Sequence, residues 1–75
     1  MVEKKSIAEA KRKAKEYSEK HGGRFHVLDR KGRHAVCLSL HSAIRDLLLA
    51  GWSVVCVYEH GEEQKFSLKE FLAQD

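Results

Sequence analysis

The chain has 75 residues, of which 43% are hydrophobic, with two cysteines, no proline and a net charge of +3. This length allows a single domain with a modest core, and the hydrophobic content excludes a disordered chain. No run reaches the roughly 20 apolar residues that span a bilayer, and no apolar stretch follows the polar start, so we expect a soluble cytoplasmic protein with no membrane partner and reduced thiols.

The first predicted element is an amphipathic helix that begins after Ser6. Ser6 and Glu9 have the spacing of a capping box, and the glycine pair at 22–23 is a typical helix stop. A narrow apolar stripe runs along the helix and consists of Ile7, Ala10, Ala14 and Tyr17. Because the remaining surface is charged, we expect the helix to lie on a sheet and not inside a core.

Residues 24–39 alternate between apolar and polar side chains around a glycine turn, which predicts a β-hairpin. Two registers are open. A two-residue turn at Lys31–Gly32 places the larger apolar side chains on one face, namely Phe25, Val27, Val36 and Leu38. A three-residue loop groups the first two of these with Ala35 and Cys37. We favour the first register because it gathers the larger side chains.

The second half predicts a short helix capped by Ser39 and stopped by Gly51, and then a central strand at 52–58 that is apolar on both faces. A short strand at 63–66 and a last helix capped by Ser67 with Glu70 follow. The order α-β-β-α-β-(β)-α predicts an α+β domain, with a small antiparallel sheet of three to four strands and helices packed on it. We place the strand at 52–58 beside the first hairpin strand, which makes every pair antiparallel.

Two segments share an apolar run, a cysteine and a histidine four positions later: Cys37 with His41, and Cys56 with His60. Residues four apart in a strand are separated by about 13 Å, whereas zinc needs ligands on bonds of roughly 2 Å. We therefore interpret the cysteines as core residues and predict no metal and no other cofactor.

Five histidines are many for this length, and a histidine can serve as an acid or a base. None has a nucleophile or a carboxylate at a recognisable spacing, and helix capping explains Ser39 and Ser42 beside His41. We therefore expect no catalytic residues and no enzyme. A small histidine-dependent nuclease is the second alternative.

Positive charge is concentrated in the first half of the chain. Residues 1–33 hold eleven Lys/Arg and five Asp/Glu, a balance of +6, whereas residues 34–75 hold three and six, a balance of −3. This asymmetry is typical of a nucleic-acid surface, although a solvated helix explains it as well. The predicted surface for phosphate binding comprises Lys11, Arg12, Lys15, Arg24, Arg30, Lys31 and Arg33. This surface predicts that the chain is a non-catalytic module that binds nucleic acid.

The strand at 52–58 predicts a different kind of interface. Simple alternation places Val55 and Val57 on one face and, on the other, Trp52, Val54, Cys56 and Tyr58. If no helix covers the second face, Trp52, Val54 and Tyr58 form the interface of a homodimer or of a protein partner. The alternative function is thus a protein-interaction module, such as a phage or mobile-element accessory or inhibitor protein. Alternatively, the first helix packs on this face, and the face is then not available to a partner.

Overall fold

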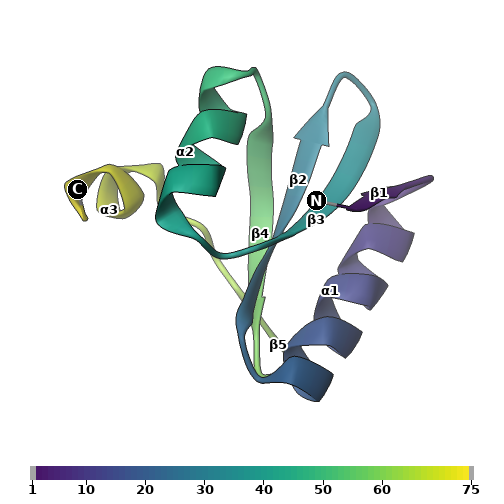
Figure 1. Cartoon of the computed structure of the whole chain (residues 1–75). Coiled ribbons are helices and arrows are strands. Elements are labelled where there is room, and N and C mark those ends of the chain that lie inside the picture. The colour runs from purple at the N-terminus through teal and green to yellow at the C-terminus, as the bar shows by residue number, and fades with distance from the viewer. Residues whose placement is uncertain (1, 75) are drawn as a thin grey trace.

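An antiparallel sheet separates two layers of helices in the computed structural model, which describes residues 2–74 (Figure 1). The elements are β1 (Val2–Lys4), α1 (Ile7–His21), β2 (Arg24–Arg30), β3 (Arg33–Leu38), α2 (His41–Leu49), β4 (Ser53–Glu59), β5 (Glu62–Gln64) and α3 (Leu68–Ala73). The sheet has five strands in the order β1-β3-β2-β4-β5. The α+β class and the place of β4 beside β2 are confirmed, whereas β1 was not predicted.

The β2–β3 hairpin has the register that we favoured. Arg30 pairs with Arg33, and Val27 pairs with Val36. The turn between the strands is formed by Lys31 and Gly32, whose φ angles of 50° and 82° are both positive. Two successive residues of positive φ fit the right-handed twist of the flanking strands, which is why a glycine stands here.

Helix α1 covers one face of the sheet. Its start has the predicted cap, since the Glu9 amide donates to Ser6 Oγ at 3.1 Å, and it ends at Gly22 with φ of 71°. The small side chains of Ala10 and Ala14 are completely buried, so the helix lies close to the strands. We call this cluster the α1-face core, and its buried members are Ala10, Ala14, Val27, Val36, Cys56 and Tyr58.

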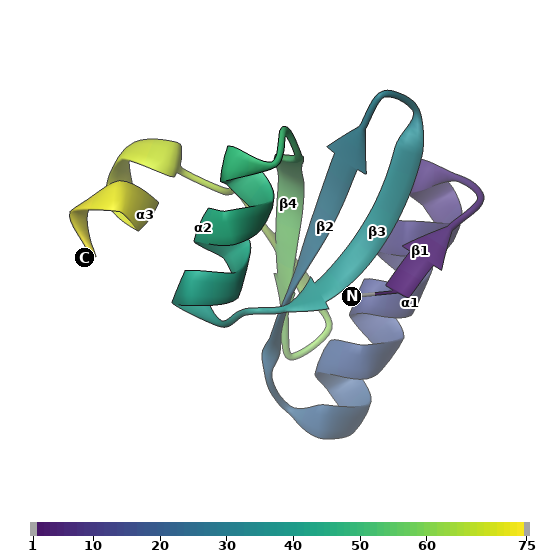
Figure 2. The same ribbon diagram turned by 45° about the horizontal axis from the view of Figure 1, so that its top comes forward.

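Helices α2 and α3 lie on the opposite side of the sheet from α1 (Figures 1 and 2). The cluster beneath them is the α2-face core, whose buried members are Leu28, Ala35, Cys37, Ile44, Trp52 and Phe71. Figure 2 also shows that the β2–β3 turn and the β3–α2 connection lie at opposite ends of the hairpin. The two ends therefore present separate surfaces.

The predicted grouping of Trp52 with Tyr58 on one face is wrong, because β4 contains a β-bulge. Val27 pairs with Cys56, but the next residue, Leu28, pairs with Val54, so Val55 is an extra residue without a partner. The extra residue reverses the alternation along the strand. Trp52 and Val54 therefore pack in the α2-face core, whereas Tyr58 packs in the α1-face core.

Ser18 joins α1 to the β4–β5 turn, although its place on the helix gives no sequence signal. It is completely buried, its hydroxyl donates to the Lys15 carbonyl at 2.9 Å, and its Oγ accepts from the Gly61 amide at 2.8 Å. We expect Ser18→Ala to lower the free energy of unfolding by about 1–3 kcal/mol, because the Gly61 amide loses its acceptor. Ser42→Ala on an exposed position of α2 is the matched control, and equal losses in urea unfolding would contradict this role.

Candidate functional site

The end of the hairpin carries more positively charged residues than the sequence predicts. Strand β1 pairs with β3 so that Lys4 lies opposite His34, next to the hairpin turn, and Lys5 follows directly. We call this cluster the basic end and define it as Lys4, Lys5, Arg30, Lys31 and Arg33. The pairing of β1 could not be read from its three residues, so the sequence did not reveal the two lysines as members.

Arg33 is held in place within the basic end. Its guanidinium donates two hydrogen bonds, of 2.8 and 2.7 Å, to the carboxylate of Glu3, and it lies 5.9 Å from the ring centroid of Trp52. This forked contact fixes the orientation of the side chain. Asp29 is the second acid nearby, with Oδ1 3.2 Å from His34 Nδ1. The basic end thus has five positive side chains, with two acidic side chains, Glu3 and Asp29, beside it.

The other predicted phosphate-binding residues lie elsewhere, and most of them have acidic partners. Lys11 Nζ lies 3.8 Å from Glu63 Oε1 on β5. Arg24, at the far end of β2, has its Nε 3.7 Å from Glu59 Oε2. Lys15 is exposed on α1 and has no acidic partner among residues 2–74.

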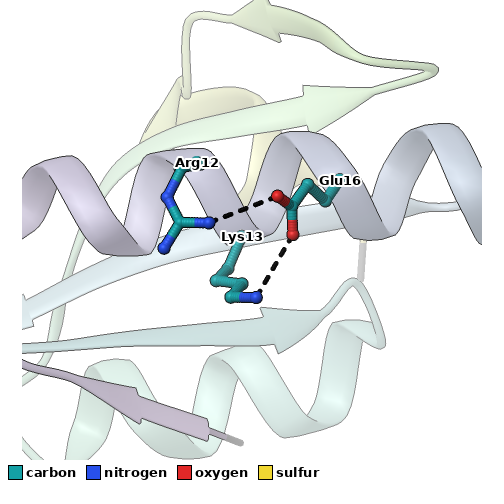
Figure 3. A network of polar contacts seen from close by, with 3 residues as sticks. All are labelled: Arg12, Lys13 and Glu16. Atoms are coloured by element: carbon teal, nitrogen blue, oxygen red, sulfur yellow. Dashed lines mark hydrogen bonds and ion pairs between the residues drawn. The ribbon is translucent and has the colours of Figure 1, made fainter.

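Arg12 belongs to a small network on α1. Its NH1 atom and the Lys13 Nζ atom each lie 3.3 Å from the carboxylate of Glu16 (Figure 3). The hydrogen bond from Lys13, more than any other interaction, holds the pKa of Glu16 below its ordinary value. These exposed ion pairs engage positive side chains of α1 that would otherwise be available to a ligand. The structure therefore brings together Arg30, Lys31 and Arg33, and it separates them from Lys11, Arg12, Lys15 and Arg24.

The residues predicted for a protein interface are mostly covered within the chain. Trp52 and Tyr58 are 6% and 8% exposed, on opposite faces of the sheet. The Tyr58 hydroxyl donates to Glu63 Oε1 at 2.8 Å, and burial together with this carboxylate raises the pKa of Tyr58 to about 12. A homodimer stays a prediction, but it cannot use one surface formed by these two rings.

The two Cys–His pairs do not converge. Cys37 is buried in the α2-face core and Cys56 in the α1-face core, while His60 lies in the β4–β5 turn. Burial raises the pKa of the Cys56 thiol. Within residues 2–74, no three side chains of His, Cys, Asp or Glu are arranged to hold a metal ion. The absence of zinc stays a prediction, which elemental analysis of the purified protein can check.

A cavity of about 140 Å³ lies at the opposite end of the hairpin from the basic end. We call it the β3–α2 cavity, because it opens where β3 connects to α2 and is closed by the segment leading into α3. Its polar lining includes Arg24, His26, Ser39, Lys65 and Glu70. These residues come from separate parts of the chain, so no local sequence pattern marks the cavity.

Ser39 and His26 form a hydrogen bond in this lining, between Ser39 Oγ and His26 Nδ1. The predicted capping role of Ser39 is wrong: the N-cap is Leu40, and no side chain caps α2. Its hydroxyl is engaged by His26, and its amide donates to the Arg24 carbonyl at 2.9 Å. His26 is 5% exposed, and burial, with a smaller effect of Arg24, lowers its pKa to about 4. The imidazole is therefore neutral at pH 7.

Four rings form one wall of the cavity. The ring centroids of His26 and Phe66 are 5.6 Å apart, those of Phe66 and Phe71 are 5.7 Å apart, and those of Phe71 and His41 are 4.2 Å apart with the planes stacked. His41 Nε2 also donates to the Phe71 carbonyl at 3.0 Å. These contacts fasten α3 to the sheet and to α2.

None of the helices in residues 2–74 is both long and apolar enough to cross a membrane. Comparisons with protein-family models, with curated proteins and with solved structures give no match for this chain.

Proposed function

We propose that this protein is a non-catalytic module that binds the phosphate backbone of nucleic acid through its basic end. The observation that carries the proposal is the pairing of β1 with β3, which sets Lys4 beside the hairpin turn. It adds Lys4 and Lys5 to the three positive residues that the sequence placed at this end of the hairpin. We place the module in the cytoplasm, because Cys37 and Cys56 are free thiols.

Apart from Arg33, which is paired with Glu3, the charges of the basic end are available at little cost. Arg30 and Lys31 have no acidic partner among residues 2–74, so phosphate contacts would break no ion pair of theirs. Lys11 and Arg12 on α1 are paired and should contribute less. A turn that carries lysine and arginine contacts phosphates but reads no base edges, so we expect affinity without sequence preference.

The test compares two variants that lose the same amount of charge. Lys5→Gln/Arg30→Gln/Lys31→Gln removes three of the five positive charges of the basic end, and Lys15→Gln/Lys20→Gln/Lys69→Gln removes the charges of three exposed lysines elsewhere. In titrations of duplex DNA at two salt concentrations, we expect the first variant to lose about 10- to 100-fold in affinity. Its slope of log affinity against log salt should fall by up to about 2.7, which is about 0.9 for each phosphate released. The second variant should stay close to the wild type.

Equal losses in the two variants would show that only net charge matters and would contradict a defined site. If the wild type fails to bind either duplex or single strands at low salt, the proposal is wrong, and the protein-interaction alternative takes its place. Cleavage of RNA by the purified protein would instead favour the nuclease alternative.

A further inference from the structure

The β3–α2 cavity contains hydrogen-bonding capacity that the fold does not use. A neutral imidazole carries one hydrogen. If the Ser39 hydroxyl donates to His26 Nδ1, the hydrogen on Nε2 is left over. If Nδ1 donates to Ser39 Oγ, the hydroxyl hydrogen is left over. In either tautomer, one hydrogen of this part-buried pair has no acceptor in a side chain or backbone group of residues 2–74, so it is available to a ligand in the cavity.

The charged groups around the cavity favour a negative acceptor. Lys65 and Arg24 line it with two positive charges, and Glu70 is the one acid in the lining formed by residues 2–74. Glu59, which lies 3.7 Å from Arg24, stands outside the lining. The first turn of α2 borders the same space and adds the positive end of its dipole. The helix end reinforces the preference that the side chains establish.

Size and shape define the rest of the ligand. The cavity volume of about 140 Å³ is close to that of engineered cavities, of about 150 Å³, that hold one benzene molecule. Phe66, Phe71 and Ile44 supply apolar walls, and aromatic rings pack well against a planar ligand. A single ring therefore matches the volume of the cavity, and a polar group on that ring can reach the charged side chains that line it.

We propose that the β3–α2 cavity binds a small organic anion, composed of one planar ring and a carboxylate or phosphate group. The anionic oxygen accepts the spare hydrogen of the Ser39–His26 pair and lies near Lys65 and Arg24, while the ring contacts Phe66 and Phe71. This site is independent of nucleic-acid binding, because the basic end lies at the other end of the hairpin.

The first experiment titrates the ¹⁵N-labelled protein with four probes and follows amide shifts by NMR. Benzoate and phenyl phosphate each combine a ring with an anion, benzyl alcohol keeps the ring alone, and inorganic phosphate keeps the anion alone. We expect at least one ring anion to bind saturably with a dissociation constant on the order of 1 mM, as suits so small a ligand. Shifts should concentrate at residues 39–43 and 65–71. Benzyl alcohol should bind at least about tenfold more weakly.

The second experiment uses Lys65→Gln, with Lys69→Gln on α3 as the matched control because Lys69 does not line the cavity. Lys65→Gln should lower the affinity for the ring anion several-fold and leave the affinity for benzyl alcohol unchanged. Lys69→Gln should change neither affinity. Lys5→Gln/Arg30→Gln/Lys31→Gln should bind the ring anion with the affinity of the wild type. The two proposals can therefore fail independently of each other. Absence of saturable binding, equal affinity for benzyl alcohol, or shifts centred on another surface would each overturn the inference.

Discussion

Unfolding measurements should find the protein roughly 3 kcal/mol less stable near pH 4 than at pH 7, with His26 responsible for most of the loss. Burial lowers the pKa of His26 from its ordinary 6.5 to about 4 in the folded state. Between these values the unfolded chain binds a proton that the folded chain does not, so stability falls as the pH falls through this window. Each pKa unit corresponds to about 1.4 kcal/mol.

Two variants separate His26 from the general effect of acid. His26→Gln cannot be protonated, so its stability should change far less between about pH 6.5 and pH 4, even if it is lower at pH 7. His21→Gln, at an exposed position in the last turn of α1, should keep the pH dependence of the wild type. A wild-type stability that stays constant across this window would show that His26 is hydrated and accepts a proton in the folded state.

Elements with local signals could be predicted from the sequence. The capping pair Ser6 and Glu9 sits three residues apart, and the hydrogen bond it predicts is present. The Lys31–Gly32 turn, whose two φ angles are positive, belongs to the register that was favoured because it gathers the larger apolar side chains on one face. In both cases the residues that decide the structure are neighbours in the chain, so competing partners are few.

Ser39 and β1 show where such reasoning ends. Ser39 has the position of a cap, but His26, which is thirteen residues away and lies on a neighbouring strand, engages its hydroxyl instead. Val2–Lys4 is a short and mostly polar segment that becomes a strand only because β3 offers it an edge. Preferences that depend on a distant partner leave no pattern in the sequence.

The candidate sites depend on the same distant pairings. Arg33 was predicted as a phosphate ligand, but the sequence could not show that Glu3, thirty residues earlier, would fix its direction. The β3–α2 cavity joins side chains from β2, the β3–α2 connection and the segment before α3. Charge totals could therefore indicate a basic surface, but the composition of each site required the tertiary structure.

The bulge in β4 is the feature with the largest consequence for both cores. Val54 pairs with Leu28, Cys56 pairs with Val27, and Val55 stands between them without a partner and 42% exposed. A strand without the extra residue could still make both pairs in the same register. The two adjacent valines conceal this arrangement in the sequence, because either one satisfies the apolar pattern.

Deleting Val57 should therefore lower the free energy of unfolding by at least about 4 kcal/mol, whereas deleting Val55 should cost only about 1 kcal/mol. Val57 is 1% exposed and pairs with His26, so its loss forces part of β4 to slip by one residue and exchanges the side chains of the two faces. Removal of Val55 only straightens the strand, and Trp52 and Tyr58 keep their separate cores. Urea unfolding followed by Trp52 fluorescence measures both deletions. Similar losses in the two variants would show that Val55 does more than occupy the bulge, and a stable Val57 deletion would contradict the register of β4.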